Sequence, residues 1–328
     1  MKTKLISVVL PTYNVVRYLG KCLDSLIEQT YSNIEILVVI DGATDGSHEL
    51  AQEYEKKDSR IRVIYQENAG SGPARNNGII NSKGEFITFV DPDDWVKPDF
   101  VDELVSLQSK GDYDLVVTGS EAHVFENGSE KSVSLHSFSK EEYYNSIEQV
   151  RNRYNQIRFV EQQINAPWAK LFRASIIKEN EVRFPDLRRS QDIYFNGEYY
   201  KRITSMIEST YCGYCYRVIH GEFAKVRKDY FKISEVLFNQ YKSIVAEWGI
   251  EPDMSYIYRT SLLNIISNYE SLLSQKDSLD DINASAYVID VLNNGKSSNP
   301  YHKIMQFCLK KKLFLLARIA IYIKYKLK

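Results

Sequence analysis

The chain has 328 residues, of which 44% are hydrophobic and 26% are charged, so its composition is that of a globular protein large enough to bury a core. Its formal net charge is −1, but residues 303–328 carry eight basic and no acidic side chains. This leaves −9 on residues 1–302, which argues against nucleic-acid binding. Four cysteines and no hydrophobic signal segment after Met1 argue against a secreted disulfide framework, so we expect a cytoplasmic protein.

Short apolar runs alternate with helical patterns over the first 118 residues. The runs lie at Leu5–Leu10, Ile34–Ile40, Ile61–Tyr65, Phe86–Val90 and Leu115–Thr118. They are nearly continuous in Val, Ile and Leu, as strands covered on both faces are. Between the first two runs, residues 15–29 place their apolar side chains on one helical face. This alternation predicts an α/β fold with a mainly parallel sheet flanked by helices.

Polar, turn-forming or acidic residues follow each of the first four predicted strands. The segments are PTYN at 11–14, DGATDGS at 41–47, ENAGSG at 67–72 and DPDD at 91–94. Ligands of such sheets bind beyond the carboxyl ends of the strands. We therefore expect these four segments to line the binding site.

The segment 91–94 concentrates negative charge directly after an apolar run. Like charges repel one another more strongly as water is excluded, so the cluster requires a compensating partner. Asp91 and Asp93 could present oxygens to a hard divalent cation such as Mg²⁺ or Mn²⁺, which would also bind phosphate oxygens. A local alternative is that Asp94 or Asp99 caps the helix that begins near Pro98.

A glycine-rich turn at residues 70–78 leads into a predicted helix. It places Arg75 in the first turns, where its guanidinium could reach a diphosphate. Asp41, at the end of the second strand, could accept a hydrogen bond from a base or a ribose. The alternatives are an exposed arginine after a left-handed turn and a solvated aspartate.

Residues 120–230 are less regular. Trp168 offers an indole face that suits the apolar side of a sugar ring, although core packing would explain this residue equally well. Cys212 and Cys215 have the spacing of half a zinc site, but no second pair accompanies them, so we expect two small residues near a strand. A basic cluster that could close over a diphosphate follows at His220, Lys225, Arg227 and Lys228.

The pattern is helical again from about residue 230, with segments near 231–248, 254–274, 278–294 and 300–326. The longest apolar run, 313–323, is interrupted by Arg318 and is too short for a membrane span, which takes about 20 apolar residues. Lysines bracket this run, as in a helix that lies on an anionic membrane surface. Packing of its apolar side on the preceding helices is the alternative.

Four ordered segments carry a more specific signal. They are SVVLPTYN at 7–14, VVIDGATDGS at 38–47, the stretch 68–76 and FVDPDDW at 89–95, followed by NAPWAKLF at 165–172 and SQDIYFN at 190–196. Their order and spacing resemble those of family-2 inverting glycosyltransferases with the GT-A fold. The resemblance is specific over residues 5–118, and none is recognised beyond about residue 225.

The resemblance implies a nucleotide-sugar donor, preferably a UDP-sugar, at the ends of the strands. Its binding residues would be Pro11, Thr12, Tyr13, Asn14, Asp41, Asn68, Gly70, Arg75, Asp91 and Pro92. A cofactor, Mn²⁺ or Mg²⁺, would be held by Asp93, Asp91 and His220, although His220 could also be a solvated or core histidine. The acceptor would be bound by Trp168 and Lys170.

The resemblance also implies that Asp192 is the general base that takes the proton of the acceptor hydroxyl. A single displacement at the anomeric carbon would then invert its configuration. The alternative is that Asp192 or Ser190 caps the following helix. Two positions depart from the family pattern: Gln191 stands where a glutamate is usual, and Ile40 where an aspartate is common.

The sequence thus predicts a GT-A domain over residues 1–229, with a nucleotide-binding half (1–118) and an acceptor-binding half (119–229), and a helical C-terminal region over 230–328. The acceptor would be a growing bacterial glycan on a lipid carrier at the cytoplasmic membrane, as in capsule or wall polysaccharide assembly, or on a protein such as an adhesin. The basic tail favours the lipid carrier.

Two other classes of function fit the sequence less well. A non-catalytic nucleotide-binding scaffold subunit of a glycosyltransferase complex would need neither Asp93 nor Asp192, so the presence of both argues against it. A nucleotidyltransferase would need a basic glycine-rich loop after the first strand, and residues 11–14 contain none.

Overall fold

The computed structural model describes residues 3–158, 165–219, 230–249, 254–274 and 285–326. The internal contacts divide the chain into two units, Met1–Glu222 and Phe223–Lys328, each of which is described by itself. The domain boundaries expected from the sequence remain predictions.

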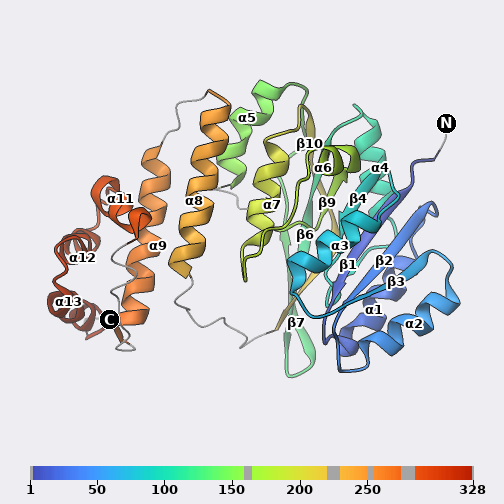
Figure 1. Ribbon diagram of the computed structural model, residues 1–328, viewed down its shortest axis with the longest axis horizontal. Helices are drawn as coiled ribbons and strands as arrows, with labels where there is room; N and C mark the ends of the chain where they lie inside the picture. Colours follow the sequence, from blue (N-terminus) through green and yellow to red (C-terminus); the bar gives the residue numbers. More distant parts are fainter. Residues whose placement is uncertain (1–2, 159–164, 220–229, 250–253, 275–284, 327–328) are drawn as a thin grey trace. The chain divides into compact units, whose positions relative to one another are not determined.

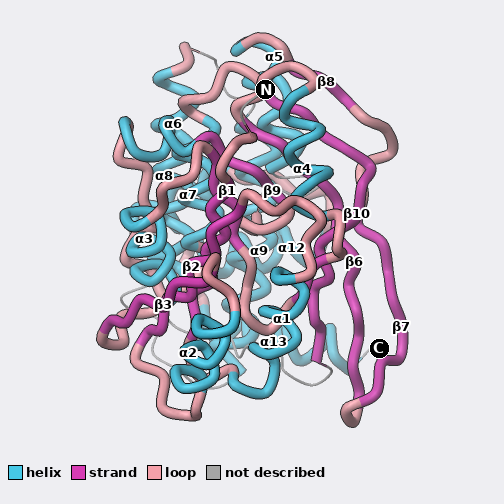
Figure 2. Tube along the Cα trace, turned by 90° about the vertical axis from the view of Figure 1, so that its right-hand side faces the viewer, coloured by secondary structure: helices cyan, strands magenta, loops and turns pink. Residues whose placement is uncertain are grey.

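The first unit is built on one sheet, whose strands run from β3 to β5 in the order β3-β2-β1-β4-β9-β6-β10-β5, with β7 beside β6 and β8 beside β10 (Figures 1 and 2). The strands are β1 (Ile6–Thr12), β2 (Ile34–Asp41), β3 (Ile61–Gln66), β4 (Phe86–Phe89), β5 (Trp95–Val96), β6 (Leu115–Glu126), β7 (Ser129–His136), β8 (Glu142–Tyr144), β9 (Lys170–Arg173) and β10 (Met206–Ile219).

Strands β1 to β4 form the parallel half that the sequence predicts. β1 pairs in parallel with β2 and β4, and β2 pairs in parallel with β3. Their carboxyl ends therefore meet at one edge, where the four polar segments follow. All seven residues of β1 are buried, which explains its continuous apolar run.

The second half of the sheet differs from a simple parallel arrangement. The short strand β9 lies between β4 and β6 and is antiparallel to both. β6 continues eight residues past the predicted end at Thr118. The sequence does not indicate this extension, because most of the later residues are not fully buried and they do not form a continuous apolar run. β10 then pairs in parallel with β6.

Helices cover both faces of the sheet in the first unit (Figure 1). They are α1 (Val16–Ile27), α2 (Ser47–Lys57), α3 (Ser71–Asn81), α4 (Phe100–Ser109), α5 (Ile147–Gln156), α6 (Ala174–Glu179) and α7 (Gln191–Tyr200). Apolar residues of α1 and α4 share one core with alternate residues of β1 and β2. On the other face, rings of β4, β9 and α7 pack edge to face.

Helix α3 lies unusually close to the sheet. A Cβ at Gly78 would overlap with Cγ1 of Val9 on β1, so only glycine allows this approach. Because Val9 is β-branched and buried within the sheet, it has little freedom to give way. The contact fixes the height of α3, which carries Arg75 over the ends of the strands.

The second unit contains α8 (Tyr230–Glu247), α9 (Met254–Ser274), α11 (Ala286–Asn294), α12 (Pro300–Lys310) and α13 (Phe314–Lys326). The prediction of one helix over 300–326 was wrong. Lys312 has a left-handed φ of 56°, and the Leu313 N–H donates to the Cys308 carbonyl at 2.7 Å, which ends α12 in a compact turn. No helix within the described residues combines the length and the apolar character that crossing a membrane requires.

Candidate active site

The loops after β1 and β2 are tied together at the edge of the sheet. Asn14, with a left-handed φ of 48°, accepts a hydrogen bond on Oδ1 from the Thr44 N–H at 2.8 Å. Pro11 and Thr12 are buried, whereas the Tyr13 ring is 49% exposed. Asn14 is also exposed, but its side chain holds the β2 loop, so Tyr13 is the predicted residue of this turn whose exposed side chain remains for a ligand.

Asp41 ends β2 and organises the loop that follows β3. Its Oδ1 accepts from the Ala69 N–H and its Oδ2 from the Gly70 N–H, both at 2.8 Å. The Asn68 amide returns a bond to the Asp41 carbonyl at 3.0 Å. Asp41 is only 2% exposed, so the alternative of a solvated turn residue is wrong. The predicted residues 41, 68 and 70 thus form one hydrogen-bonded unit.

Gly42 is required where these loops meet. Its φ is +65°, and a Cβ there would lie 2.8 Å from the Asn68 backbone nitrogen. Any other residue would push the β3 loop away from Asp41.

Arg75 connects two carboxylates that are far apart in the sequence. Its Nη2 donates to Asp91 Oδ1 at 2.7 Å and its Nη1 donates to Asp192 Oδ1 at 3.0 Å. Arg75 is only 5% exposed, so it is not the exposed arginine of the alternative interpretation. Its Nε–H is buried and makes no hydrogen bond to any described residue, so this donor is unsatisfied within the described part of the chain.

The turn at 91–94 is held from behind by β10. The Asp91 N–H donates to the Tyr214 hydroxyl at 3.1 Å, and this hydroxyl donates to Asp94 Oδ2 at 2.6 Å. The Arg217 N–H donates to Asp94 Oδ1 at 2.7 Å. Burial, followed by the charges of Asp91 and Asp93, raises the pKa of Asp94 to about 8. Asp94 is therefore a buried anchor of the turn.

Neither of the helix caps proposed for this segment forms. Asp94 bonds to β10 instead. Asp99 precedes α4 but makes no capping bond, and its carboxylate accepts from the Tyr211 hydroxyl at 2.6 Å. Pro92, between the two predicted metal ligands, is buried.

Asp91 and Asp93 suit a divalent cation. Burial, with a further contribution from the Asp91 charge, raises the pKa of Asp93, although the charges of Arg217 and Arg75 oppose this rise, so a bound cation would further stabilise its ionised form. No described side chain donates a hydrogen bond to the Asp93 carboxylate, and Asp91 uses only Oδ1 toward Arg75. Carboxylate oxygens are the ligands that Mg²⁺ and Mn²⁺ prefer. His220, the third predicted ligand, lies outside the described residues.

Asp192 stands in the first turn of α7, beside the acidic turn. Burial raises its pKa, while the positive charges of Arg75 and Lys170 oppose that rise. Ser190 occupies the N-cap position with a left-handed φ of 56° but makes no side-chain capping bond. Ser190 therefore does not cap the helix, and Asp192 lies inside it, paired with Arg75.

Gln191 has a structural role in this arrangement. Its amide donates to the Leu187 carbonyl, and its Oε1 accepts from the Ser71 hydroxyl at 3.4 Å. A Cβ at Gly72 would overlap with that Oε1, so α3 and α7 meet closely here. An amide serves as both donor and acceptor at this contact, which a carboxylate cannot do.

Lys170 is buried and supports the segment that carries Trp168. Its Nζ donates to the Ala166 carbonyl at 2.7 Å. Burial lowers the pKa of Lys170 to about 7, and the Asp192 charge opposes this shift. The Trp168 ring stacks on Tyr214 at 4.6 Å and on Tyr216 at 5.5 Å. Trp168 thus contacts Tyr214, which supports the acidic turn, and also lines a pocket together with Tyr216.

This pocket has a volume of about 590 Å³. It is lined by Thr118, Ser120, Ala122, His136, Asn165, Ala166, Trp168, Ala169, Lys170, Tyr216 and Val218. Aromatic faces beside hydroxyl and amide groups are suited to a sugar.

Sequence reasoning missed the residues of β10 that position the turn. These residues are Tyr214 and Arg217, which both bond to Asp94 of the turn. Arg217 Nε also donates to the Asp93 carbonyl at 2.8 Å. The only signal was a tyrosine-rich run from 211 to 216, which by itself does not show which strand it joins.

A second group of potential ligands lies elsewhere on the sheet. Among the described residues, Glu121, His123 and Cys215 bring their ligand atoms within 4.8 Å of one another. None of these residues was predicted as a ligand.

Comparison with known proteins identifies the family. The family model described as glycosyl transferase family 2 matches residues 7–180, more than half of the chain. The chain belongs to glycosyl transferase family 2. The matched region includes the four ordered motifs, the acidic turn, Arg75 and Trp168, and it ends before Asp192.

Curated relatives in this family are bacterial. Glycosyltransferase GlyA of Streptococcus pneumoniae is 36% identical over 224 residues, which are 67% of this chain but 32% of GlyA. Putative glycosyltransferase EpsH of Bacillus subtilis is 35% identical over 66% of this chain and 62% of its own length. Glycosyltransferase GlyG of S. pneumoniae is 31% identical over 83% of this chain and 89% of GlyG.

Solved structures confirm the fold. S. aureus TarS 1–349 in complex with UDP-GlcNAc has a TM-score of 0.70 at 18% identity, covering 98% of this chain and 91% of that structure. The same TarS fragment in complex with UDP has a TM-score of 0.68. The predictions of a glycosyltransferase domain and of the GT-A fold with C-terminal helices are therefore confirmed.

The support of the acidic turn can be tested by removing one hydroxyl. Tyr214→Phe should lower the free energy of unfolding by about 1–3 kcal/mol, because it removes a donor to buried Asp94 and an acceptor for the Asp91 N–H. Urea unfolding measures this change. Tyr216→Phe is the control, since its hydroxyl has no hydrogen bond to the described residues. Equal losses in both variants would contradict the role given to Tyr214.

Proposed function

We propose that this chain is a metal-dependent inverting glycosyltransferase that moves a sugar from a UDP-sugar to a hydroxyl of a growing glycan. The observation that carries the proposal is the Arg75 bridge, which sets the candidate base Asp192 beside the candidate metal ligand Asp91. A base for the acceptor and a cation for the leaving group are the two groups that such a transfer requires.

The donor would lie across the ends of β1, β2 and β4. Tyr13 and the loop ordered by Asp41 would contact the base and ribose, together with the other predicted residues Pro11, Thr12, Asn14, Asn68, Gly70 and Pro92. The UDP and UDP-GlcNAc complexes of TarS, a protein of the same fold, support a uridine nucleotide. The Arg75 guanidinium would supply positive charge near the diphosphate.

Asp91 and Asp93 would hold Mn²⁺ or Mg²⁺, with His220 as a further proposed ligand. A divalent cation in this position offsets the negative charge that grows on the departing nucleoside diphosphate. Asp192 would accept the proton of the acceptor hydroxyl as that oxygen bonds to the anomeric carbon. The bond from this carbon to the phosphate oxygen breaks on the opposite side, so the configuration inverts.

The acceptor would occupy the pocket beside Trp168. The stacked rings of Trp168 and Tyr216 support binding of a sugar face, while Lys170 holds the backbone of that segment. The role of Lys170 in acceptor binding would therefore be indirect. We place the acceptor glycan on a lipid carrier, as in capsule or wall polysaccharide assembly, with a protein-linked glycan as the second possibility.

Base and acceptor contacts can be separated by kinetics. Asp192→Asn should lower kcat by a factor of about 10² to 10⁴, because it removes the proton acceptor. UDP affinity should stay within a fewfold, because Arg75 keeps its ion pair with Asp91 when the one with Asp192 is lost. Trp168→Leu should instead raise the KM for the acceptor. Transfer is measured with a panel of UDP-sugars and short glycan acceptors. An Asp192→Asn variant with unchanged kcat would refute the assignment of the base.

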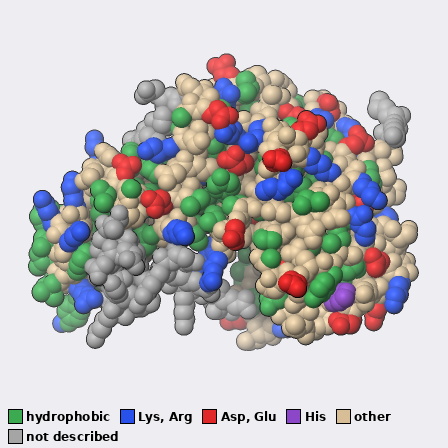
Figure 3. Space-filling model, viewed as in Figure 1, with side chains coloured by type: hydrophobic (Ala, Val, Ile, Leu, Met, Phe, Trp, Pro, Cys, Tyr) green, Lys and Arg blue, Asp and Glu red, His purple; other side chains and the backbone are tan. Residues whose placement is uncertain are grey.

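A peripheral membrane contact is proposed for α12 and α13. Exposed apolar side chains recur every third or fourth residue of α13, while Ala317 and Ile321 are buried. The exposed residues are Leu315, Leu316, Ile319, Tyr322 and Ile323. Figure 3 shows hydrophobic and basic side chains together over these helices at the left. This face, flanked by Lys310–Lys312 and Lys326, suits an anionic membrane at the cytoplasmic side.

Vesicle sedimentation tests this contact. The chain should bind vesicles that contain anionic lipid and should bind zwitterionic vesicles at least tenfold more weakly, because the lysines need anionic headgroups. The double variant Leu315→Glu/Ile319→Glu should lose binding. Val133→Glu/Leu135→Glu, which changes two exposed apolar residues of β7, is the matched control. Equal binding by both double variants would contradict the proposal.

A further inference from the structure

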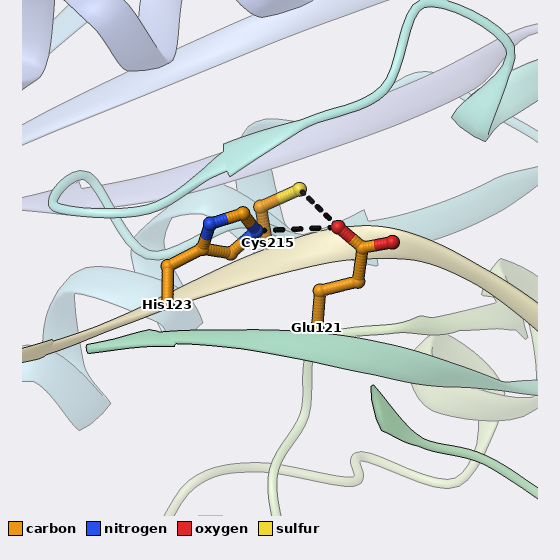
Figure 4. A group of neighbouring side chains, drawn as sticks. All are labelled: Glu121, His123 and Cys215. Atoms are coloured by element: carbon orange, nitrogen blue, oxygen red, sulfur yellow. Dashed lines mark hydrogen bonds and ion pairs between the residues drawn. The ribbon is translucent and has the colours of Figure 1, made fainter. Parts of the chain in front are cut away.

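The side chains of Glu121, His123 and Cys215 converge on one face of the β6–β10 pair (Figure 4). Successive side chains of a strand point to opposite faces. Ser120 and Ala122 line the acceptor-side pocket, so Glu121 and His123 lie on the other face of β6. Cys215 is the direct cross-strand partner of Glu121. The sheet register therefore brings the three groups together.

Two of the three separations between the ligand atoms are close to those of a zinc site. His123 Nε2 lies 3.2 Å from Glu121 Oε2, and Cys215 Sγ lies 3.9 Å from the same oxygen. With the usual Zn–N, Zn–O and Zn–S bond lengths, tetrahedral angles require separations of about 3.4 Å and about 3.6 Å. Shifts of a few tenths of an ångström in these two separations would meet those values.

The His123 ring is held in the orientation that a metal ligand needs. Its Nδ1 lies 2.9 Å from Glu130 Oε2, and its ring centroid lies 4.6 Å from that of Trp95. A hydrogen bond from Nδ1–H to a carboxylate places the lone pair on Nε2, the atom that faces Glu121 and Cys215.

The charge of Lys97 is paired with one carboxylate oxygen of Glu121, and the other oxygen faces His123 and Cys215. Lys97 Nζ lies 2.6 Å from Glu121 Oε1, so the ammonium occupies one oxygen while Oε2 faces the other two ligands. Cys215 is 2% exposed, and the side chains of Glu121 and His123 are 16% and 12% exposed. The site is thus shielded, as zinc–thiolate sites are.

We propose that Glu121, His123 and Cys215 bind a zinc ion that joins β6 to β10. Thiolate, imidazole and carboxylate together favour Zn²⁺ over Mg²⁺ or Mn²⁺. On binding, the S–H bond of Cys215 breaks, its proton leaves to solvent and a Zn–S bond forms. The ion would stabilise the two strands whose opposite face lines the acceptor-side pocket. This proposal does not depend on the proposed activity.

Cobalt titration of the full chain, after treatment with a chelator, tests the site. Co²⁺ should produce the near-ultraviolet absorption of a thiolate–cobalt bond, saturate at one ion per chain, and be displaced by Zn²⁺. Asp91 and Asp93 have no sulfur and cannot produce this absorption. Cys215→Ser should abolish it, whereas Cys212→Ser should retain it. A folded wild-type chain without the absorption, or a Cys215→Ser variant that keeps it, would overturn the proposal.

A milder variant tests the geometry without removing a ligand. Glu130→Gln should weaken zinc binding by about 10- to 100-fold, because it removes the carboxylate that orients His123. Glu126→Gln, another exposed glutamate in the same hairpin, should leave affinity unchanged. Competition with a chromophoric chelator measures both values. Equal affinities in the two variants would overturn the assignment of His123 as a ligand.

Discussion

The two ion pairs of Arg75 are the interaction on which the candidate site depends. A buried guanidinium is stable only where carboxylates compensate its charge, and its planar fork can serve two of them in fixed directions. Asp91 follows β4 in the half that carries the nucleotide-binding motifs, and Asp192 lies in the first turn of α7 in the half that carries Trp168. The bridge therefore sets the distance between the two chemical functions of the site.

The acidic turn shows how one cluster of like charges divides into separate roles. Asp94 is buried and bonded to Tyr214 and the Arg217 backbone, with a pKa of about 8, so it supports the turn. Asp91 pairs with Arg75. Asp93 has no such partner among the described side chains, and burial raises its pKa. Of the three carboxylates, Asp93 would therefore gain most from a bound cation.

Much of the nucleotide-binding half could be predicted because its information is local. Continuous apolar runs identify β1 to β4, and each polar segment follows its strand directly, so Asp41 and Asp91 could be placed at one edge of the sheet from order alone. The family resemblance added Arg75 and Asp192, although not their direct ion pair. That pair depends on how closely α3 approaches the sheet, which Gly78 permits.

The rest depends on contacts between distant segments. β6 and β10 contain alternating polar residues, and no local pattern indicates that residue 215 pairs with residue 121. For this reason Cys215 could not be connected with Glu121 and His123, and Tyr214 could not be recognised as the support of the acidic turn. The break at Lys312 was also missed, because the helical pattern continues on both sides of the left-handed residue.

The most direct test of the account is calorimetric titration of the chain with UDP, with Mn²⁺ and with a chelator. We expect binding that requires Mn²⁺ and weakens at least tenfold in Asp93→Asn, while Asp102→Asn, which removes an exposed carboxylate in α4, leaves it unchanged. Equal UDP affinity with Mn²⁺ and with chelator, or in wild type and Asp93→Asn, would contradict a cation held at the acidic turn. Absence of UDP binding to the folded chain would contradict the uridine nucleotide itself.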